Sequence, residues 1–406
     1  MVHVQFKIDN MNMKKYKLGD LLSEFHAGKA IQTENVKNKG AYPVYGGNGQ
    51  RGYTDSYNQD GEYLIIGRQG AYCGNVRYNI GKAYLTEHAI VGQAKENHNP
   101  IYIALKLSLM KLSQLQGQSA QPGLSVNTLS CISMEMPPKE IQDKIADIML
   151  KLDRKIELNK QINDNLEAMA KQLYDYWFVQ FDFPNEEGKP YKSSGGAMVW
   201  NEKLKREIPT SFDVKSLSEI IEVKDGTHDS PKPQDNGYFL LTSKHLTERG
   251  LDYASAYKIS KEDYESINKR SKVDTNDILF SMIGTIGNSY FVEETKINFA
   301  IKNMALFKTS AKRWFSEYMY LYLSSCDYKH YEGNSLSGSI QKFVSLRTLR
   351  DMPILYHEDI IKVFAKEVRN IITMMVNLRK ENIELTKQRD ELLPLLMNGQ
   401  ASVNSD

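Results

Sequence analysis

The glycine-rich segment between Tyr45 and Tyr53 is the first place where residue types and spacing could do chemistry. Gly47, Gly49 and Gly52 fit the GxGxxG pattern, which holds a dinucleotide pyrophosphate when it follows a strand and opens a helix. The residues after it, 53–61, are rich in Asp, Asn, Ser and Gly, and this composition is typical of turns rather than of a helix. We therefore interpret the segment as a tight exposed turn, whose backbone either approaches a ligand or simply closes a hairpin.

A second candidate motif is Asn99-Pro100-Ile101-Tyr102. DNA amino-methyltransferases use Asn-Pro-Pro-Tyr or Asn-Pro-Pro-Phe to hold the exocyclic amine of a flipped base and to stack on its ring. Here the third position is Ile, and no glycine-rich cofactor loop lies at a suitable distance along the chain. We therefore expect the motif to open a helix, with proline in the first turn.

Hydrolytic and metal-binding patterns are absent from the sequence. The eight histidines show no HxxxH or HExxH spacing, and there is no GxSxG or Walker A motif. Cys73, Cys131 and Cys326 lie far apart, which favours free thiols in a reducing compartment. No apolar run approaches the roughly 20 residues that span a bilayer, and residues 1–17 lack the apolar core of a secretory signal. We expect a cytoplasmic, non-catalytic protein with no metal or cofactor of its own.

Polar and basic side chains in loop-like segments suit DNA, because Arg and Lys pair with guanine or phosphate, and Asn and Gln pair with adenine. The net charge is only +2, so composition alone does not indicate a nucleic-acid-binding protein. Each residue singly is more often just solvated, and only the clustering in paired loops, which also contain His88, motivates the prediction. The candidates are Lys29, Asn48, Arg51, Tyr53, Arg68, Gln69, Ser119 and Gln121 in the first half, and Thr227, His228, Lys232, Lys244, His245, Ser281, Thr285, Lys302, Asn303, Ser339 and Gln341 in the second.

The elements that must position these loops occur twice, with a period of about 220 residues. A segment that ends in Gly28 matches one that ends in Gly226. The β-rich run 62–76 has its counterpart at 276–289. A Leu-x-x-hydrophobic-x-hydrophobic pattern then precedes each of two long helical segments, at 129–134 and 349–354.

The two long helices are predicted from Glu140 to Trp177 and from about Glu358 to Leu393, where Pro394 follows. Apolar residues alternate in steps of three and four, which is typical of a coiled coil. An aromatic cluster at 176–183 ends the first helix and is expected to pack on the second. The predicted seam is Ile145, Ile148, Leu152, Ile162, Leu166, Met169 and Leu173 in the first helix, and Phe364, Val368, Ile371, Met375, Leu378, Leu385 and Leu392 in the second.

One seam position in each helix is polar, Asn159 and Asn382. Their offset, 382 − 159 = 223, also maps the apolar seam of the first helix onto that of the second. A buried asparagine can fix the register of a coiled coil at a cost in stability, whereas the alternative is a merely tolerated polar residue. The first interpretation predicts that Asn159→Leu raises thermal stability and loosens the spacing of the two halves.

The plan of recognition segment, helix, recognition segment, helix resembles the specificity (S) subunit of type I restriction-modification systems. Four local phrases are similar to that family: Tyr42 to Gly49, Gly61 to Gly70, Pro137 to Gln142 at the first helix start, and Trp177 to Pro184 after it. The second helix start departs from the pattern, because 356–359 replace the Pro-Pro pair.

The resemblance implies an α+β fold with two mixed α/β target-recognition domains in a pseudo-twofold arrangement, joined by two long antiparallel coiled-coil helices. Its parts would be a first target-recognition domain (1–138), a first spacer helix with an aromatic cap (139–184), a linker with the second target-recognition domain (185–357), and a second spacer helix with a tail (358–406).

The resemblance also implies a function. The chain would recognise a bipartite sequence in double-stranded DNA and dock two methyltransferase (modification) subunits together with restriction/translocase subunits. S-adenosylmethionine, ATP and Mg would be bound by those partner subunits only. The alternatives are a catalytic DNA methyltransferase or fused restriction-modification enzyme, which needs a cofactor loop and an intact Asn-Pro-Pro-aromatic motif, and a coiled-coil scaffold without DNA contact.

Overall fold

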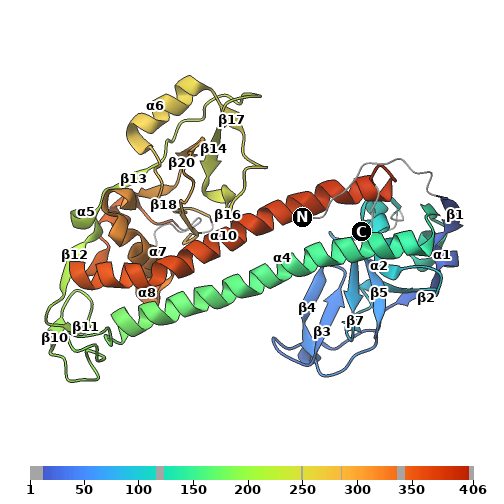
Figure 1. Ribbon diagram of the computed structural model, residues 1–406, viewed down its shortest axis with the longest axis horizontal. Coiled ribbons are helices and arrows are strands. Elements are labelled where there is room, and N and C mark those ends of the chain that lie inside the picture. Colours follow the sequence, from blue (N-terminus) through green and yellow to red (C-terminus); the bar gives the residue numbers. More distant parts are fainter. Residues whose placement is uncertain (1–11, 116–122, 248–249, 285, 336–342, 402–406) are drawn as a thin grey trace. The chain divides into compact units, whose positions relative to one another are not determined.

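The computed structural model describes residues 12–115, 123–247, 250–284, 286–335 and 343–401. The chain forms two compact units, which we call unit 1 (residues 1–157 with 384–406) and unit 2 (residues 158–383). Two long helices, α4 (Lys139–Tyr174) and α10 (Glu358–Met397), each contribute residues to both units (Figure 1). None of the described helices is long and apolar enough to span a membrane.

Unit 1 is built on two sheets and a short strand pair. The pair is β1 (Lys14–Lys17) with β9 (Ser133–Met136). An antiparallel sheet has the order β2 (Leu22–Ala27), β8 (Ala89–Ala94), β5 (Glu62–Gly67) and β6 (Val76–Ile80). A second sheet has the order β4 (Gly49–Thr54), β3 (Tyr42–Gly46) and β7 (Tyr84–Leu85), with β3 and β7 parallel. The helical elements are α1 (Leu18–Leu21), η1 (Thr33–Asn35), α2 (Pro100–Ser108), η2 (Leu112–Leu115) and α3 (Val126–Ser130).

Unit 2 repeats this order of strands. Its short pair is β12 (Asp213–Ser216) with β22 (Pro353–Tyr356). Its antiparallel sheet is β13 (Val223–Asp225), β21 (Ala305–Phe307), β18 (Ile278–Phe280) and β19 (Ser289–Phe291). Its second sheet is β17 (Lys258–Ile259), β14 (Tyr238–Thr242) and β20 (Phe299–Lys302), again with a parallel pair, β14 and β20. Two hairpins are added, β10 (Met198–Asn201) with β11 (Arg206–Pro209), and β15 (Leu246–Thr247) with β16 (Gly250–Leu251). The helical elements are η3 (Asp175–Val179), α5 (Leu217–Ile220), η4 (Ser243–His245), α6 (Lys261–Ser271), η5 (Thr309–Phe315), α7 (Ser316–Ser324), α8 (Cys326–Ser335) and α9 (Leu346–Arg350).

The repeat predicted from the sequence is confirmed, down to individual contacts. Gly28 and Gly226 lie at equivalent close approaches of two strands. A Cβ would be 2.4 Å from the carbonyl oxygen of Leu85 at the first and 2.5 Å from that of Ile301 at the second. Only glycine therefore fits either position without moving the backbone. The fold class of two mixed α/β parts with two long helices is also confirmed.

The first helix ends as expected, in an aromatic cluster that packs on α10. A π-helical turn, η3, follows α4, and Phe178 lies edge-on to Phe364 of α10 with ring centroids 4.9 Å apart. Trp177 lies 5.4 Å from the same ring. Edge-to-face aromatic contacts of this kind add to the free energy of burial, so the cluster fixes the end of α4 on α10.

The predicted seam of α4 is wrong in phase over part of its length. Ile162 and Met169 are exposed and Ala170 is fully buried, whereas Asn159 is fully buried, as its predicted seam position requires. Asn159 Nδ2 donates a hydrogen bond to Glu381 Oε2 at 2.7 Å. At the second of the two exposed positions, the small side chain of Ala170 occupies the buried face, and its larger neighbour Met169 points outward.

The predicted end of the second helix is also wrong, since α10 continues through Pro394 to Met397. Proline lacks the N–H for the helical hydrogen bond, which disfavours a helix interior. Leu396, Met397 and Ala401 are buried in the core of unit 1, and this apolar burial offsets the cost of proline near the helix end.

Candidate nucleic-acid interface

Three loops of unit 1 meet at one end of its sheets. They are the β3–β4 turn (46–49), the β5–β6 loop (67–75) and the β7–β8 loop (86–88). A Cβ on Gly47 would lie 3.0 Å from the carbonyl oxygen of His88 and 3.2 Å from that of Gln69, so the three loops are in contact. The GxGxxG segment is thus the β3–β4 turn and hairpin, and the interpretation of it as a tight turn is confirmed.

The predicted DNA-binding residues of the first half are distributed around these loops. Asn48 and Arg51 are exposed at the β3–β4 turn, and Lys29 is exposed just after β2. Arg68 and Gln69 are half-buried in the β5–β6 loop. Tyr53 is exposed farther along β4, where its backbone pairs with Lys37 rather than with the turn, and Ser119 and Gln121 lie outside the described residues.

In unit 2 the segment after β13 and the β20–β21 turn bring Thr227, His228, Lys302 and Asn303 together. Asn303 N donates to the Thr227 carbonyl oxygen at 3.2 Å. Ser243 Oγ donates to the Asn303 carbonyl oxygen at 2.9 Å, and Lys302 Nζ donates to Ser230 Oγ. Asn303 has a φ of 54°, a conformation that asparagine tolerates better than most residues. The backbone of the β20–β21 turn is therefore held from two sides.

Two predicted residues of the second half face the interior instead. His245 and Ser281 are buried. His245 Nδ1 accepts a hydrogen bond from Thr242 N at 2.8 Å, and burial, then the charge of Lys244, lowers the pKa of the His245 imidazole. Ser281 Oγ donates to the carbonyl oxygen of Ile283 at 3.1 Å. Both side chains hold their own loops in shape, so they do not present a polar group to DNA in this conformation.

The other candidates of the second half are placed as follows. Lys232 is exposed in a loop of unit 2, and Lys244 is exposed in η4. Thr285, Ser339 and Gln341 lie outside the described residues.

Sequence reasoning missed several residues of these loops. Asp225 is buried and forms an ion pair with Arg270 of α6, 45 positions later, which no local pattern could reveal. Glu87 lies beside His88. Tyr72, in the β5–β6 loop, is half exposed. The run Gly70-Ala71-Tyr72 could have indicated it from the sequence, because an aromatic residue close to a turn glycine suits a binding loop.

The Asn-Pro-Ile-Tyr motif caps a helix, as predicted. Asn99 Oδ1 accepts hydrogen bonds from Ile101 N and Tyr102 N, both at 2.9 Å, at the start of α2. Tyr102 is buried in the core of unit 1. Both polar and aromatic groups of the motif are therefore committed to the fold, and neither is available to hold a base.

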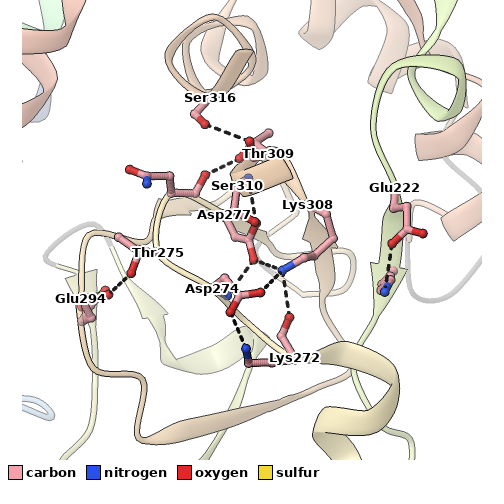
Figure 2. A network of polar contacts seen from close by, with 12 residues as sticks. Glu222, Lys272, Asp274, Thr275, Asp277, Glu294, Lys308, Thr309, Ser310 and Ser316 are labelled. Carbon is pink, nitrogen blue, oxygen red and sulfur yellow. Dashed lines mark hydrogen bonds and ion pairs between the residues drawn. The ribbon is translucent and has the colours of Figure 1, made fainter. Parts of the chain in front are cut away.

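A buried ion-pair network anchors two loop-bearing strands of unit 2 at their opposite end (Figure 2). Asp277, fully buried before β18, accepts hydrogen bonds from Asp274 N at 2.8 Å and Ser310 N at 3.1 Å. Lys308, which follows β21, donates to Asp277, to Asp274 at 2.9 Å and to the Lys272 carbonyl oxygen at 3.0 Å. Since β18 leads into the 281–288 loop and β21 follows the 302–304 turn, the network fixes the strands that position both.

A carboxylate also joins each globular part to a long helix. In unit 2, buried Glu317 of α7 pairs with Arg369 of α10 at 2.9 Å and with Arg313 at 2.5 Å. In unit 1, Asp153 of α4 accepts from Tyr78 of β6 at 2.5 Å and from Arg389 of α10 at 3.0 Å. These bonds tie α7 in unit 2 and β6 in unit 1 to the long helices through charge-assisted contacts.

An apolar stripe runs along the exposed side of α4 and η3 in unit 2. Leu158, Ile162, Met169 and Tyr176 have exposed fractions between 37% and 51%. Their spacings of four, seven and seven residues place them on one face of the helix. We call these four residues the α4 stripe.

Comparisons with known proteins agree on one family. The family profile described as "Type I restriction modification DNA specificity domain" matches residues 10–168. The EcoprrI specificity subunit of Escherichia coli is 40% identical over 154 residues, which are 37% of this chain and 38% of that protein, so this match spans less than half of the relative. The MjaIX specificity subunit of Methanocaldococcus jannaschii is 26% identical over 388 residues, covering 86% of this chain and 84% of that one.

A solved structure shares the fold over nearly the whole length. The S subunit of a type I restriction-modification system from M. genitalium superposes with a TM-score of 0.66 at 16% identity, covering 96% of this chain and 97% of that one. The sequence relatives and the solved structure with the same fold are thus proteins of one kind, and the two halves of this chain repeat the same sheets. Residues 10–168 match the type I restriction modification DNA specificity domain, and the chain is similar over most of its length to type I restriction-modification specificity subunits.

Proposed function

We propose that this chain recognises a bipartite sequence in double-stranded DNA, with unit 1 reading one part and unit 2 the other. The observation that carries the proposal is the duplicated loop cluster, in which sheets with the same strand order present the same set of loops in each unit. Arg51 and Asn48 in unit 1, and Lys302 and His228 in unit 2, supply donors and acceptors that suit base edges and phosphates.

The weak positive charge has a consequence for binding. Affinity for DNA depends strongly on the number of phosphates that Lys and Arg neutralise, and this chain has a net charge of only +2. The exposed cations in or next to the loops, among them Lys29 and Lys244, provide few such contacts. We expect the isolated chain to bind DNA poorly, and tight binding to need partner subunits that contribute further phosphate contacts.

The α4 stripe is the surface that we assign to a modification subunit. Contiguous exposed apolar side chains on a helix face are typical of sites where another helix packs. In this proposal two modification subunits and the restriction/translocase subunits assemble with the chain in the cytoplasm. They carry S-adenosylmethionine, ATP and Mg, while this chain supplies recognition and spacing. The alternative of a methyltransferase has less support, because Asn99 and Tyr102 are committed to the helix cap.

Sequencing of methylated DNA tests the proposal. The chain is expressed with its modification subunit in a host that lacks other adenine methylation, and methylated positions are mapped across the genome. We expect one motif made of two short sequences separated by a spacer of fixed length. An uninterrupted motif, or no sequence preference at all, would refute the proposed reading by two units.

A matched pair of variants separates docking from recognition. Met169→Glu places a charge on the α4 stripe, and we expect the modification subunit no longer to copurify with the chain. The control is Lys160→Glu, at a solvent-exposed position of the same helix two residues after Leu158 and therefore on another face, which should copurify as wild type does. Equal copurification of both variants would contradict the assignment of the stripe.

A further inference from the structure

A chain of four polar side chains ends at the β20–β21 turn of unit 2. Arg270 of α6 pairs with Asp225, and the other carboxylate oxygen of Asp225 lies 3.1 Å from His228 Nε2. His228 Nδ1 in turn lies 2.9 Å from Asn303 Oδ1. Asp225 is buried, whereas the His228 ring is largely exposed and Asn303 is half-buried. The contacts therefore lead from a fixed, buried charge to an amide at the loop surface.

Unit 1 contains the same order of groups. His88 Nε2 lies 3.3 Å from Glu87 Oε1, and His88 Nδ1 lies 3.3 Å from Gln69 Oε1. As in unit 2, the carboxylate faces Nε2 and the carboxamide faces Nδ1. Gln69 belongs to the β5–β6 loop and His88 to the β7–β8 loop, so the contact crosses between two of the three loops that meet in this unit.

The likeness does not follow from the sequence repeat alone. In unit 2 the histidine comes from the segment after β13 and the amide from the β20–β21 turn. In unit 1 the histidine comes from the β7–β8 loop and the amide from the β5–β6 loop. The two units thus place a carboxylate, an imidazole and a carboxamide in the same order with residues from different loops. We call each set a histidine relay: Asp225–His228–Asn303 and Glu87–His88–Gln69.

The chemistry of the relay fixes the amide. A carboxylate only accepts hydrogen bonds, so it selects the ring form in which Nε2 carries a proton and thereby orients the imidazole. The carboxamide oxygen that faces Nδ1 also only accepts, so Nδ1 must carry a proton as well, and the doubly protonated ring donates both to the carboxylate and to the amide oxygen. The amide side chain can then no longer rotate freely. The opposite edge of the amide still offers one C=O and one N–H side by side. That pair matches the N6 donor and the N7 acceptor of adenine in the major groove.

We propose that Asn303 and Gln69 each read an adenine, one in each part of the recognised sequence, and that His228 and His88 are positioning residues that hold the two amides. This inference rests on the proposed function. A fixed amide presents its donor and acceptor in one order only and loses little side-chain entropy on binding. Guanine offers two acceptors at the same groove edge and satisfies only one of the two amide groups.

The test uses the chain in complex with its modification subunit and maps methylated motifs for each variant. Asn303→Ala should relax one base position in one part of the motif, where the preference for adenine falls about 5- to 150-fold, the range for losing a bidentate base contact. His228→Phe should relax the same position and leave the other part unchanged. Gln69→Ala and His88→Phe should do the same in the other part.

Two further variants distinguish positioning from a general structural effect. His228→Asn places an amide nitrogen where Nδ1 stood, and should restore much of the preference that His228→Phe loses. His26→Phe is the control. His26 also lies near a carboxylate and a carboxamide, but both face its Nε2, at 3.7 Å from Glu24 and 3.5 Å from Gln59, and it belongs to β2. It should give the wild-type motif.

The outcomes separate the two proposals. Histidine variants that copurify with the modification subunit and keep the wild-type preference at every position would overturn the relay. So would an equal loss of methylation at all sites without any change in the motif. A wild-type complex that yields no two-part motif would instead refute the proposed function, whatever the relay variants do.

Discussion

Replacing Lys308 with methionine should strongly destabilise unit 2, because it leaves a carboxylate without its counter-ion inside the fold. The Asp277 carboxylate has no solvent exposure and Lys308 has 12%. Removing one partner of a buried ion pair costs about 3–5 kcal/mol, whereas an exposed pair contributes little. Unit 2 spans 383 − 158 + 1 = 226 residues, and at this size 1 kcal/mol shifts the melting temperature by about 2–4 °C. The expected fall is therefore about 6–20 °C.

The tryptophans give a readout that is specific to this unit. Trp177, Trp200 and Trp314 are the three tryptophans of the chain, and all lie within 158–383. Thermal and urea unfolding followed by tryptophan fluorescence therefore report on unit 2, independently of unit 1. Circular dichroism of the same samples reports on both units together.

The matched control is Lys272→Met. Lys272 pairs with Asp274 at 2.9 Å but is largely exposed, so its loss should leave the fluorescence midpoint close to that of the wild type. If Lys308→Met and Lys272→Met shift the midpoint equally, the argument from burial is wrong. A shift of less than about 1 kcal/mol for Lys308→Met would lead to the same conclusion.

Three more predictions follow from the described contacts. Burial acts to raise the pKa of Asp274, but hydrogen bonds from Lys308 and Lys272 outweigh it and lower that pKa. The resulting stabilisation of the folded state is complete above the pKa of Asp274 in the unfolded chain, about 4, and is lost as the pH falls through the lower pKa of the folded state. The part of the Lys308→Met destabilisation that comes from Asp274 should therefore be present in urea unfolding at pH 7 and should shrink below about pH 4. Asn159→Leu removes a fully buried amide whose Oδ1 has no hydrogen-bond partner, so it should raise the free energy of unfolding by about 1–3 kcal/mol in the fluorescence assay. It should also broaden the range of spacer lengths found in methylated motifs. A single unchanged spacer length would contradict a role of Asn159 in register. Gly49→Ala would place a Cβ 1.6 Å from an Arg77 nitrogen at a φ of 104°, and should abolish the preference in one part of the methylated motif while sparing the other; loss in both parts would show that the turn does not act locally.

The sequence predicted the large elements well, because their signals are long and repeated. Period-seven patterning over some 36 residues indicates a helix whatever surrounds it, and α4 is 36 residues long. The phase of the buried face was harder to predict. Ile162 and Met169 look like seam residues until the stripe that they form on the exposed side of α4 is seen. Apolar residues that lie at the surface of a helix cannot be distinguished from core residues by periodicity alone.

The candidate interface was predictable only in part, for a related reason. Polar residues in loops can be recognised in the sequence, but the direction of each side chain depends on contacts with distant segments. His245 turns inward because Thr242 N and its apolar surroundings hold it there. The partners that matter for His228 come from three segments, and Arg270 is 42 residues away. Local patterns carry no information about such pairs.

The division of α10 between the two units has a consequence for synthesis of the chain. Unit 2 is one continuous stretch, so every residue it needs has been made once residue 383 has left the ribosome. Unit 1 is made first but stays incomplete until the last turns of α10 are made, since Leu396 and Met397 fill a core that also contains Ile145 and Met149. Although domains usually fold from the N-terminus as they emerge, here the first unit to be made is the last that can close. Its open core must wait through more than 220 residues of elongation, from 157 to 384, and this interval is when the nascent protein is most exposed to misfolding.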